Sequence, residues 1–347
     1  MFIPSYKITN KILINIAKIE AAEEVIKNAP LLPLWEKKFK QDAIIRAVYH
    51  GTHIEGNLLK KDEAEDVLLG KDIIARPRDI REIINYRKVI EFIDEEAKKK
   101  IEKITEQLIK KMHRIIVDKI LPFEELGEYR KKQVVIRNSK TGEITFRPPP
   151  PIEVPFLMRE FVYWLNNSDF EKIHPVLKAG IAHHELVRIH PFLDGNGRVA
   201  RTLATLILFL GGYDIRRFFS LEEYYDRDAS SYYENLQKAT KGDLTSWLEY
   251  FTLGAEIEFE KVKEKILKLS KDVKLKEKIG GQQIFLTERQ IKIIEYIQEV
   301  GFLQNQSFKT LFPDISEDSI LRDLKYLIDK GLIKKVGSTK NARYLMI

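Results

Sequence analysis

The chain has 347 residues, of which 44% are hydrophobic, so it is long enough for two or three domains with buried cores. It contains no cysteine, which excludes disulfides, thiolate nucleophiles and cysteine-ligated zinc sites. The formal net charge is +7, but most lysines alternate with glutamates, a pattern typical of solvated helix faces rather than of a dedicated nucleic-acid surface.

The first hundred residues follow a helical pattern. Apolar residues recur at helical spacing over 12–19 and again over 83–93, and two prolines, Pro30 and Pro33, separate the first helix from the second. A further helix is expected over 101–120. We expect an N-terminal helical region over residues 1–100 and a core region over 101–255.

A β-hairpin interrupts the helices of the core region. The apolar residues Val134, Val135 and Ile136 precede a polar turn, and a second short apolar run, 144–146, follows it. Four prolines at 148–151 end the hairpin, because proline continues neither a helix nor a central strand. Helical patterns then resume over residues 154–165, 175–189 and 202–210, and again over 243–251 and 256–278.

The last part of the chain has a different organisation. Gly280-Gly281 marks the clearest boundary, so we expect a linker helix over 256–280 and a separate domain over 281–347. Helix, short helix, helix and two short strands in that order resemble a winged helix-turn-helix domain, an α+β fold. DNA is therefore a candidate partner, although acidic residues share the recognition helix, and such domains also bind proteins or form dimers.

The longest apolar run, around residues 203–213, is too short to span a bilayer and ends in glycines. The start of the chain shows no cleavable targeting segment. We therefore expect a cytoplasmic protein that has no membrane partner.

The segment from His190 to Arg201, HPFLDGNGRVAR, concentrates a base, a carboxylate, an amide, two glycines and two arginines within about three helical turns. Gly195 and Gly197 let the backbone approach a ligand closely, and the following helix places the N–H groups of this loop at a helix N-terminus. Such a terminus attracts anions. Composition and spacing therefore predict an anion-binding site with a base beside it.

This segment resembles, position by position, the motif HPFx[D/E]GNGRxxR of the Fic family, and the resemblance covers residues 1–255. It implies an all-α Fic fold with the hairpin as a small flap, next to the C-terminal winged helix. It also implies an enzyme that transfers AMP from ATP to a serine, threonine or tyrosine hydroxyl of a target protein. ATP and a protein are thus the expected partners, and a second copy of the chain is a further candidate.

The motif positions imply specific roles. His190 is the expected general base, since neutral imidazole is the side chain best matched to taking a proton near pH 7. Asp194 is the expected ligand of Mg²⁺ that bridges the ATP phosphates, and a helix cap is its alternative role. Arg198 and Arg201 lie on one helix face and reach the phosphate tail, the second at the γ-phosphate. The expected phosphate cradle comprises Gly195, Asn196 (with its side-chain amide) and Gly197.

Two features outside the motif complete the resemblance. The flap residues Val134, Val135 and Ile136 would pair with the backbone of the target, or else form a plain surface hairpin. Tyr232 and Tyr233 resemble aromatics that flank the nucleotide base, with core packing as the alternative.

An upstream segment, THIEGN at 52–57, resembles the inhibitory helix of Fic proteins. Glu55 would pair with Arg201 and so keep this arginine from the γ-phosphate of ATP. Gly51 departs from the family pattern, which usually has serine or threonine there, and Thr52 is the expected substitute.

Three other functions remain open from the sequence. An enzyme with this site could mainly remove AMP from a modified protein, using the same glutamate to position water. The chain could be a DNA-binding regulator whose Fic core senses ATP, although a sensor needs no base at position 190. Transfer of another nucleotide or phosphate group is the third alternative.

Overall fold

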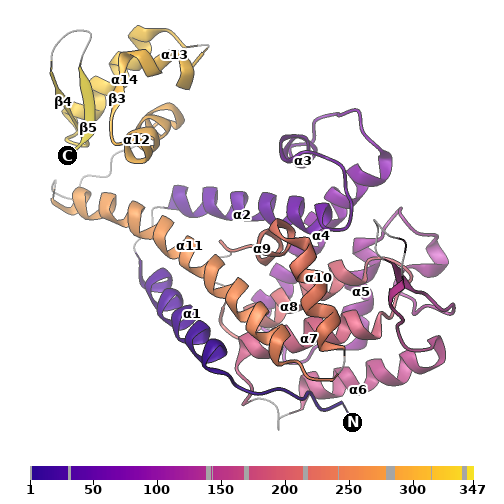
Figure 1. Cartoon of the computed structure of the whole chain (residues 1–347). Coiled ribbons are helices and arrows are strands. Elements are labelled where there is room, and N and C mark those ends of the chain that lie inside the picture. The colour runs from indigo at the N-terminus through magenta and orange to yellow at the C-terminus, as the bar shows by residue number, and fades with distance from the viewer. Residues whose placement is uncertain are drawn as a thin grey trace. The chain divides into compact units, whose positions relative to one another are not determined.

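The computed structural model describes residues 2–29, 33–137, 142, 144–167, 172–213, 218–240, 242–278, 286–313, 315–337 and 342–347. It divides into two compact units, Met1–Leu267 and Lys268–Ile347. Figure 1 shows the helices and strands of both units. Within the described residues, no helix is both long and apolar enough to cross a membrane.

The first unit is mainly helical, as expected. Its helices are α1 (Asn10–Asn28), α2 (Pro33–His53), α3 (Lys61–Leu68), α4 (Pro77–Lys98), α5 (Glu106–Ile116), α6 (Val154–Asn166), α7 (Pro175–Ile189), α8 (Asn196–Leu210), α9 (Leu221–Arg227), α10 (Ala229–Ala239) and most of α11 (Thr245–Lys278). Two short 3-10 turns, η1 (Phe123–Glu125) and η2 (Pro151–Glu153), lie between them.

Helices α7 and α8 pack against each other at the centre of this unit, and α2, α4 and α5 contact α8 while α6 contacts α7 (Figure 1). Their apolar side chains are fully buried, for example Ile181 and Leu186 on α7 and Leu203 and Leu206 on α8. Burial of side chains of this size stabilises the pair by about 1.5–3 kcal/mol each. The short loop that joins α7 to α8 is therefore held between two buried helices.

The predicted hairpin is present but shorter than expected. Strand β1 (Ile136–Arg137) pairs antiparallel with β2 (Ile144–Phe146), with Ile136 opposite Phe146. Val134 and Val135 precede the strand rather than forming part of it. Most of the turn between the strands lies outside the described residues.

Three helix predictions differ from the structure. α5 begins at Glu106 rather than at 101, because the hydroxyl of Thr105 caps it by accepting from the N–H of Leu108. α8 begins within the motif, at Asn196, rather than at 202. The two helices expected over 243–278 are one continuous helix, α11. Gly254 does not break it, since a Cβ at this position would lie 2.4 Å from Cδ1 of Tyr224, so glycine serves close packing here.

The second unit combines helices with a small sheet. Its elements are the end of α11, α12 (Glu288–Val300), β3 (Leu303–Gln304), the 3-10 turn η5 (Asn305–Ser307), α13 (Phe308–Leu311), α14 (Glu317–Asp329), β4 (Ile333–Val336) and β5 (Arg343–Met346). The sheet is antiparallel in the order β3-β5-β4, and β3 was not predicted because two residues carry no periodic signal. Ile293, Ile297, Leu324 and Leu327 form part of its core. The predicted boundary at Gly280-Gly281 lies outside the described residues.

Candidate active site

His190 directly follows α7 as its C-cap residue and has a left-handed backbone, with φ 51° and ψ 58°. This conformation is uncommon for a residue other than glycine. Ring atom Nδ1 lies 3.3 Å from the carbonyl oxygen of Val187. A carbonyl can only accept, so Nδ1 carries the proton and Nε2 keeps a lone pair. Burial is the largest influence on this imidazole and lowers its pKa to about 4, so the ring is neutral near pH 7.

Arg130 fixes the loop that follows His190. Its buried guanidinium donates from Nε to the His190 carbonyl at 2.7 Å and from Nη2 to the Pro149 carbonyl at 2.6 Å, and a third, longer bond reaches Lys132. Its backbone N–H donates to the carbonyl of Pro191 at 2.9 Å. The guanidinium therefore joins the base of the hairpin to the loop. Sequence analysis assigned Arg130 no role, because its partners are backbone carbonyls, which leave no pattern in the sequence.

Asp194 lies between two arginines. Its Oδ2 is 2.6 Å from Nη2 of Arg78, at the start of α4, and its Oδ1 is 3.0 Å from Nη2 of Arg198. Burial alone would raise the pKa of this carboxyl group, but the two arginines outweigh it and lower the pKa. The carboxylate is thus ionised and, with 28% of its side chain exposed, accessible.

The glycines of the motif allow close approaches. Gly195 has φ 79° and forms the N-cap of α8, where a Cβ would lie 3.0 Å from a methyl group of Val117. At Gly197 a Cβ would lie 2.3 Å from Oε1 of Glu55. Asn196 differs from the prediction, since its amide both accepts from and donates to the backbone of Phe192 at 2.9 Å. The side chain thus closes the loop, which leaves the backbone N–H for the predicted phosphate contact.

His113, on α5, binds the motif loop through hydrogen bonds. The sequence analysis did not identify this residue. Its Nδ1 accepts from the N–H of Gly127 at 3.0 Å, so Nε2 carries the proton and donates to the Asp194 carbonyl at 3.1 Å. The ring stacks on Phe192 with centroids 3.8 Å apart. Burial lowers its pKa to about 4, which keeps it neutral. A histidine on an amphipathic helix carries no sequence signal for this function.

Buried neutral histidines predict a protein that loses stability in mild acid. Burial lowers the pKa of both His113 and His184 to about 4, against 6.5 for an unperturbed histidine. Below pH 6.5 the unfolded chain binds more protons than the folded one, so the free energy of unfolding falls, by about 3 kcal/mol for each residue at pH 4. Urea unfolding followed by tryptophan fluorescence from about pH 7 to about pH 4.5 measures this loss. His113→Asn, which keeps an acceptor for Gly127, should flatten the dependence; an unchanged slope would contradict the assignment.

Arg201 is buried, with 2% exposed, and pairs with Glu55. Its Nη2 lies 2.8 Å from Oε1 of Glu55 and donates to the carbonyl of Gly51 at 2.9 Å. Burial alone would lower the pKa of this guanidinium, but Glu55 and the neighbouring tyrosines together outweigh it, and the pKa rises well above its usual value. The ion pair expected from the sequence is therefore formed.

Gly51 explains the departure from the family pattern. A Cβ at this position would lie 2.5 Å from Cε1 of Tyr86, so α2 can approach α4 this closely only with glycine. The hydroxyl of Thr52 donates to the carbonyl of Val48, within its own helix, at 2.9 Å. Thr52 meets Glu55 through its backbone instead, since its carbonyl accepts from the N–H of Glu55 at 3.0 Å.

The end of α2 is held by α9 and α10. His50 and His53 lie 2.7 and 2.8 Å from the carboxylate of Asp226 on α9. The hydroxyl of Tyr233 on α10 donates to the carbonyl of Ile54 at 3.1 Å. Glu55 therefore follows a helix end that is anchored on both sides.

Tyr232 is packed in the interior of the first unit. Only 1% of the residue is exposed, and its ring packs on Tyr225 with centroids 4.8 Å apart. Its hydroxyl lies 2.8 Å from Nε2 of His183. The structure therefore supports the alternative role in core packing for Tyr232, whereas Tyr233 is 46% exposed and bonds to the inhibitory turn.

Comparisons with known proteins identify one domain of the chain. Residues 103–208 match the model of the Fic/DOC family. The chain contains a Fic/DOC family domain. Curated proteins named Protein adenylyltransferase Fic are similar: that of Drosophila grimshawi is 31% identical over 220 residues, which cover 62% of this chain and 42% of the relative. That of Nematostella vectensis is 30% identical over 241 residues, 67% of this chain and 52% of the relative. The chain thus spans about half the length of these relatives.

Solved structures share the fold. A Fic family protein from Desulfovibrio desulfuricans G20 covers 100% of this chain and 98% of its own with a TM-score of 0.67, at 23% identity. Fic-1 from C. elegans is 26% identical with a TM-score of 0.62, and the match covers 74% of each chain. The matched residues 103–208 contain the motif, while Glu55, in the turn after α2, and Arg78, on α4, precede them.

Proposed function

We propose that this chain is an adenylyltransferase that transfers AMP from ATP to a hydroxyl side chain of a target protein. The observation that carries the proposal is the neutral ring of His190, whose Nε2 keeps a lone pair beside the N-terminus of α8. A base next to an anion-binding helix end is what the activation of a hydroxyl toward a phosphate requires. The similarity to adenylyltransferases supports the choice of ATP.

The reaction follows from these positions. The hydroxyl oxygen of the target attacks the α-phosphorus of ATP while Nε2 of His190 takes its proton. The bond from the α-phosphorus to the oxygen that bridges to the β-phosphorus breaks, and pyrophosphate leaves with the electron pair. Unpaired N–H groups of the first turn of α8, together with Arg198 and Arg201, stabilise the charge that builds on the phosphates.

Asp194 fits the protein side of a Mg²⁺ site. The described residues hold no group of three or more histidine and acidic side chains that could bind a metal alone. Mg²⁺ in nucleotide sites commonly uses one or two carboxylates and takes its other ligands from phosphates and water. One ionised, accessible carboxylate meets that need, and its partner Arg78, 57% exposed, can turn into solvent. Bound Mg²⁺ would supply positive charge to the phosphates.

The hairpin is proposed as the docking flap. We call the bonds from the Arg130 guanidinium to backbone carbonyls the Arg130 clamp. Strand β1 lies between this clamp and the turn, and an edge strand offers backbone groups to an extended peptide. Ile136 would contact the target within the strand, and Val134 and Val135 would contact it from the extended segment that precedes the strand. The hydroxyl of the target would thereby be aligned with His190.

The proposal includes inhibition by Glu55. Its carboxylate binds Nη2 of Arg201 and lies so close to Gly197 that no Cβ would fit there. The carboxylate therefore lies beside the first turn of α8. An arginine that is bound to a carboxylate cannot bind a γ-phosphate, and the negative charge also repels the phosphate. ATP would then bind in an unproductive position.

The C-terminal unit is proposed to be a winged helix. Its order of helix, strand, two helices and two strands, with the sheet order β3-β5-β4, supports this. We propose the domain ranges 1–100, 101–255, 256–280 and 281–347, and the division between the two units falls within the proposed linker helix.

The exposed side of α14 mixes Arg322 and Lys325 with Asp318 and Asp329, so it does not single out DNA as the partner. Self-association stays a prediction.

Parallel reactions with two labelled nucleotides test the proposal. The Glu55→Gly variant, incubated with Mg²⁺ and a cell lysate, should label protein from α-labelled ATP and not from γ-labelled ATP. The double variant Glu55→Gly/His190→Asn is the matched control and should label nothing. Label from the γ-position would indicate phosphate transfer instead. Absence of label, with release of AMP from a previously modified protein, would support AMP removal as the main activity.

A further inference from the structure

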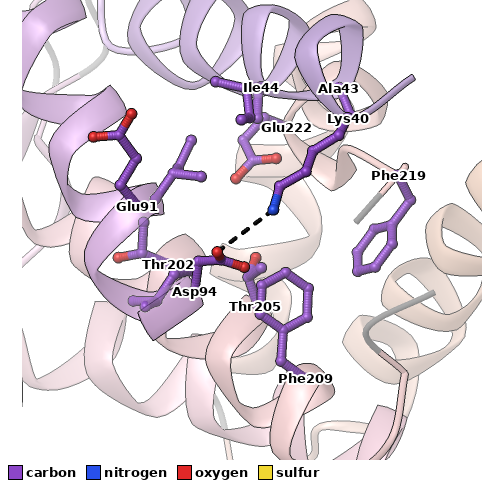
Figure 2. A pocket seen from close by; sticks show the side chains of 13 residues that line it. Lys40, Ala43, Ile44, Glu91, Asp94, Thr202, Thr205, Phe209, Phe219 and Glu222 are labelled. Carbon is purple, nitrogen blue, oxygen red and sulfur yellow. Dashed lines mark ion pairs between the residues drawn. The ribbon is translucent and has the colours of Figure 1, made fainter. Parts of the chain in front are cut away.

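A cavity of about 260 Å³ lies in the first unit, beside α8. Residues of α2, α4, α8 and α9 line it, and Figure 2 shows Lys40 reaching from α2 toward Asp94 on α4, with Phe209 and Phe219 nearby. Its walls are largely apolar, with Ile44 and Ile90 among the lining residues. A cavity of this size, below the usual range for drug-sized molecules, fits a small ligand with one apolar group.

Carboxylates outnumber basic groups around this cavity. Glu91, Asp94 and Glu222 line it together with a single basic side chain, Lys40, whose Nζ is 3.6 Å from Asp94. Asp94 has a second partner in Lys98 at 2.7 Å. Glu91 pairs with Arg87 at 2.8 Å. Glu91 and Asp94 are thus compensated by basic side chains, so Glu222 is the lining carboxylate that a cationic ligand would pair with.

Glu222 is the lining residue that would select a cationic ligand over a neutral one. It is 4% exposed, and its oxygens accept from two hydroxyls, those of Tyr86 and Ser220, each at 3.1 Å. Within the described part of the chain, no basic side chain forms an ion pair with it. A buried carboxylate that has only neutral donors is costly, and an ammonium group in the cavity would stabilise it.

The cavity is connected to the candidate active site by direct contacts. Tyr86, which donates to Glu222, packs so closely on Gly51 that a Cβ there would lie 2.5 Å from its ring. The carbonyl of Gly51 accepts from Arg201, the partner of Glu55. Thr202, the residue after Arg201, lines the cavity itself.

We propose that this cavity binds a small organic amine, an ammonium group on an aromatic or branched apolar body, and that the bound amine strengthens the inhibition by Glu55. The ammonium binds Glu222 and the apolar body contacts Phe209 and Phe219. The cavity exists in the form with the Glu55–Arg201 pair intact, so a ligand that fills it stabilises this form. The effect on activity rests on the proposed transferase function, whereas the binding does not.

Calorimetry with 2-phenylethylamine, in the absence of ATP, tests the site on the full chain. The wild type should bind the amine and not 2-phenylethanol, its neutral analogue. Glu222→Gln, which keeps an acceptor for Tyr86, should weaken binding about 10- to 100-fold, as expected for the loss of a charge-assisted hydrogen bond. Lys40→Met removes the competing cation and should tighten binding. Absence of binding to the wild type, or equal binding by Glu222→Gln, would overturn the proposal.

A second variant guards against misfolding at Glu222. Ala43→Leu places extra volume in the cavity from α2 and should block binding while leaving the thermal unfolding midpoint near that of the wild type. With the transferase assay, the amine should reduce AMP transfer by the wild type and not by Glu55→Gly, although Glu55→Gly should still bind it. Binding without any AMP transfer by either chain would leave the site standing and refute the proposed function. Amine binding that leaves wild-type AMP transfer unchanged would refute the coupling.

Discussion

Replacing His190 is expected to lower the rate of AMP transfer by about 10²- to 10⁴-fold while ATP affinity stays unchanged. The ring supplies the base and makes no contact that binding of the phosphates requires. Because the backbone at this position is left-handed, His190→Asn is a better test than alanine, since asparagine tolerates that conformation. Initial rates in the Glu55→Gly background, with calorimetric titration of ATP, give both quantities. A parallel loss of ATP affinity would show that His190 acts in binding.

The lowered pKa of His190 also predicts how the rate of AMP transfer depends on pH. A protonated imidazole cannot accept a proton, so the rate should fall only as the pH approaches the lowered pKa of His190, about 4. Between about pH 5.5 and about pH 8 the value of kcat/KM should be flat, without the inflection near 6.5 that an exposed histidine gives. An inflection at 6.5 would mean that the ring is solvated in the working enzyme.

Replacing Glu55 by glycine is expected to raise AMP transfer about 10- to 100-fold, because a charge-assisted contact of about 1.5–3 kcal/mol no longer competes for Arg201. Glu55→Gln keeps the size without the charge and should give an intermediate rate. Replacing Glu65, on the exposed side of α3, by glycine is a matched control and should leave the rate unchanged. Equal rates for wild type and Glu55→Gly would contradict inhibition by this residue.

The same variant carries a stability consequence that separates the ion pair from a local packing effect. Without Glu55, the buried guanidinium of Arg201 loses its carboxylate, which we expect to reduce the free energy of unfolding by about 1–3 kcal/mol. ATP should restore this stability by supplying a phosphate. Urea unfolding with and without ATP measures both effects, and Glu55→Gln should behave like glycine in this assay.

Periodicity recovered most of the fold, and its failures have local causes. α7 was predicted over 175–189 and the second strand of the hairpin over 144–146, both as observed, because prolines and strand residues mark their limits. The break expected between residues 251 and 256 is absent, and Gly254, which lies in that gap, permits close packing of α11 on Tyr224. The start of α8 was placed too late because its first turn is polar and belongs to the site.

The candidate site was predictable where one segment holds its residues and where a family motif marks Glu55. The residues missed act across the fold: His113 from α5, Arg130 through backbone carbonyls, and Arg78 through an ion pair with Asp194. Tyr232 is the opposite case, a residue that was predicted at the site and lies in the core. Aromatic residues in a buried cluster and aromatic residues around a nucleotide base have the same sequence pattern. Contacts between distant segments require the packing of the helices, which a single sequence does not specify residue by residue.

The Arg130 clamp has a consequence for how this site can diverge. The guanidinium holds the carbonyls of His190, Pro149 and Lys132, groups that every amino acid carries. Substitutions at Lys132 can therefore change the side chain presented beside the hairpin without altering the bond that places the base. The geometry of the catalytic loop and the surface offered to a target can thus vary independently of each other. A scaffold of this kind can acquire new targets through point changes near the hairpin while its reaction centre stays the same.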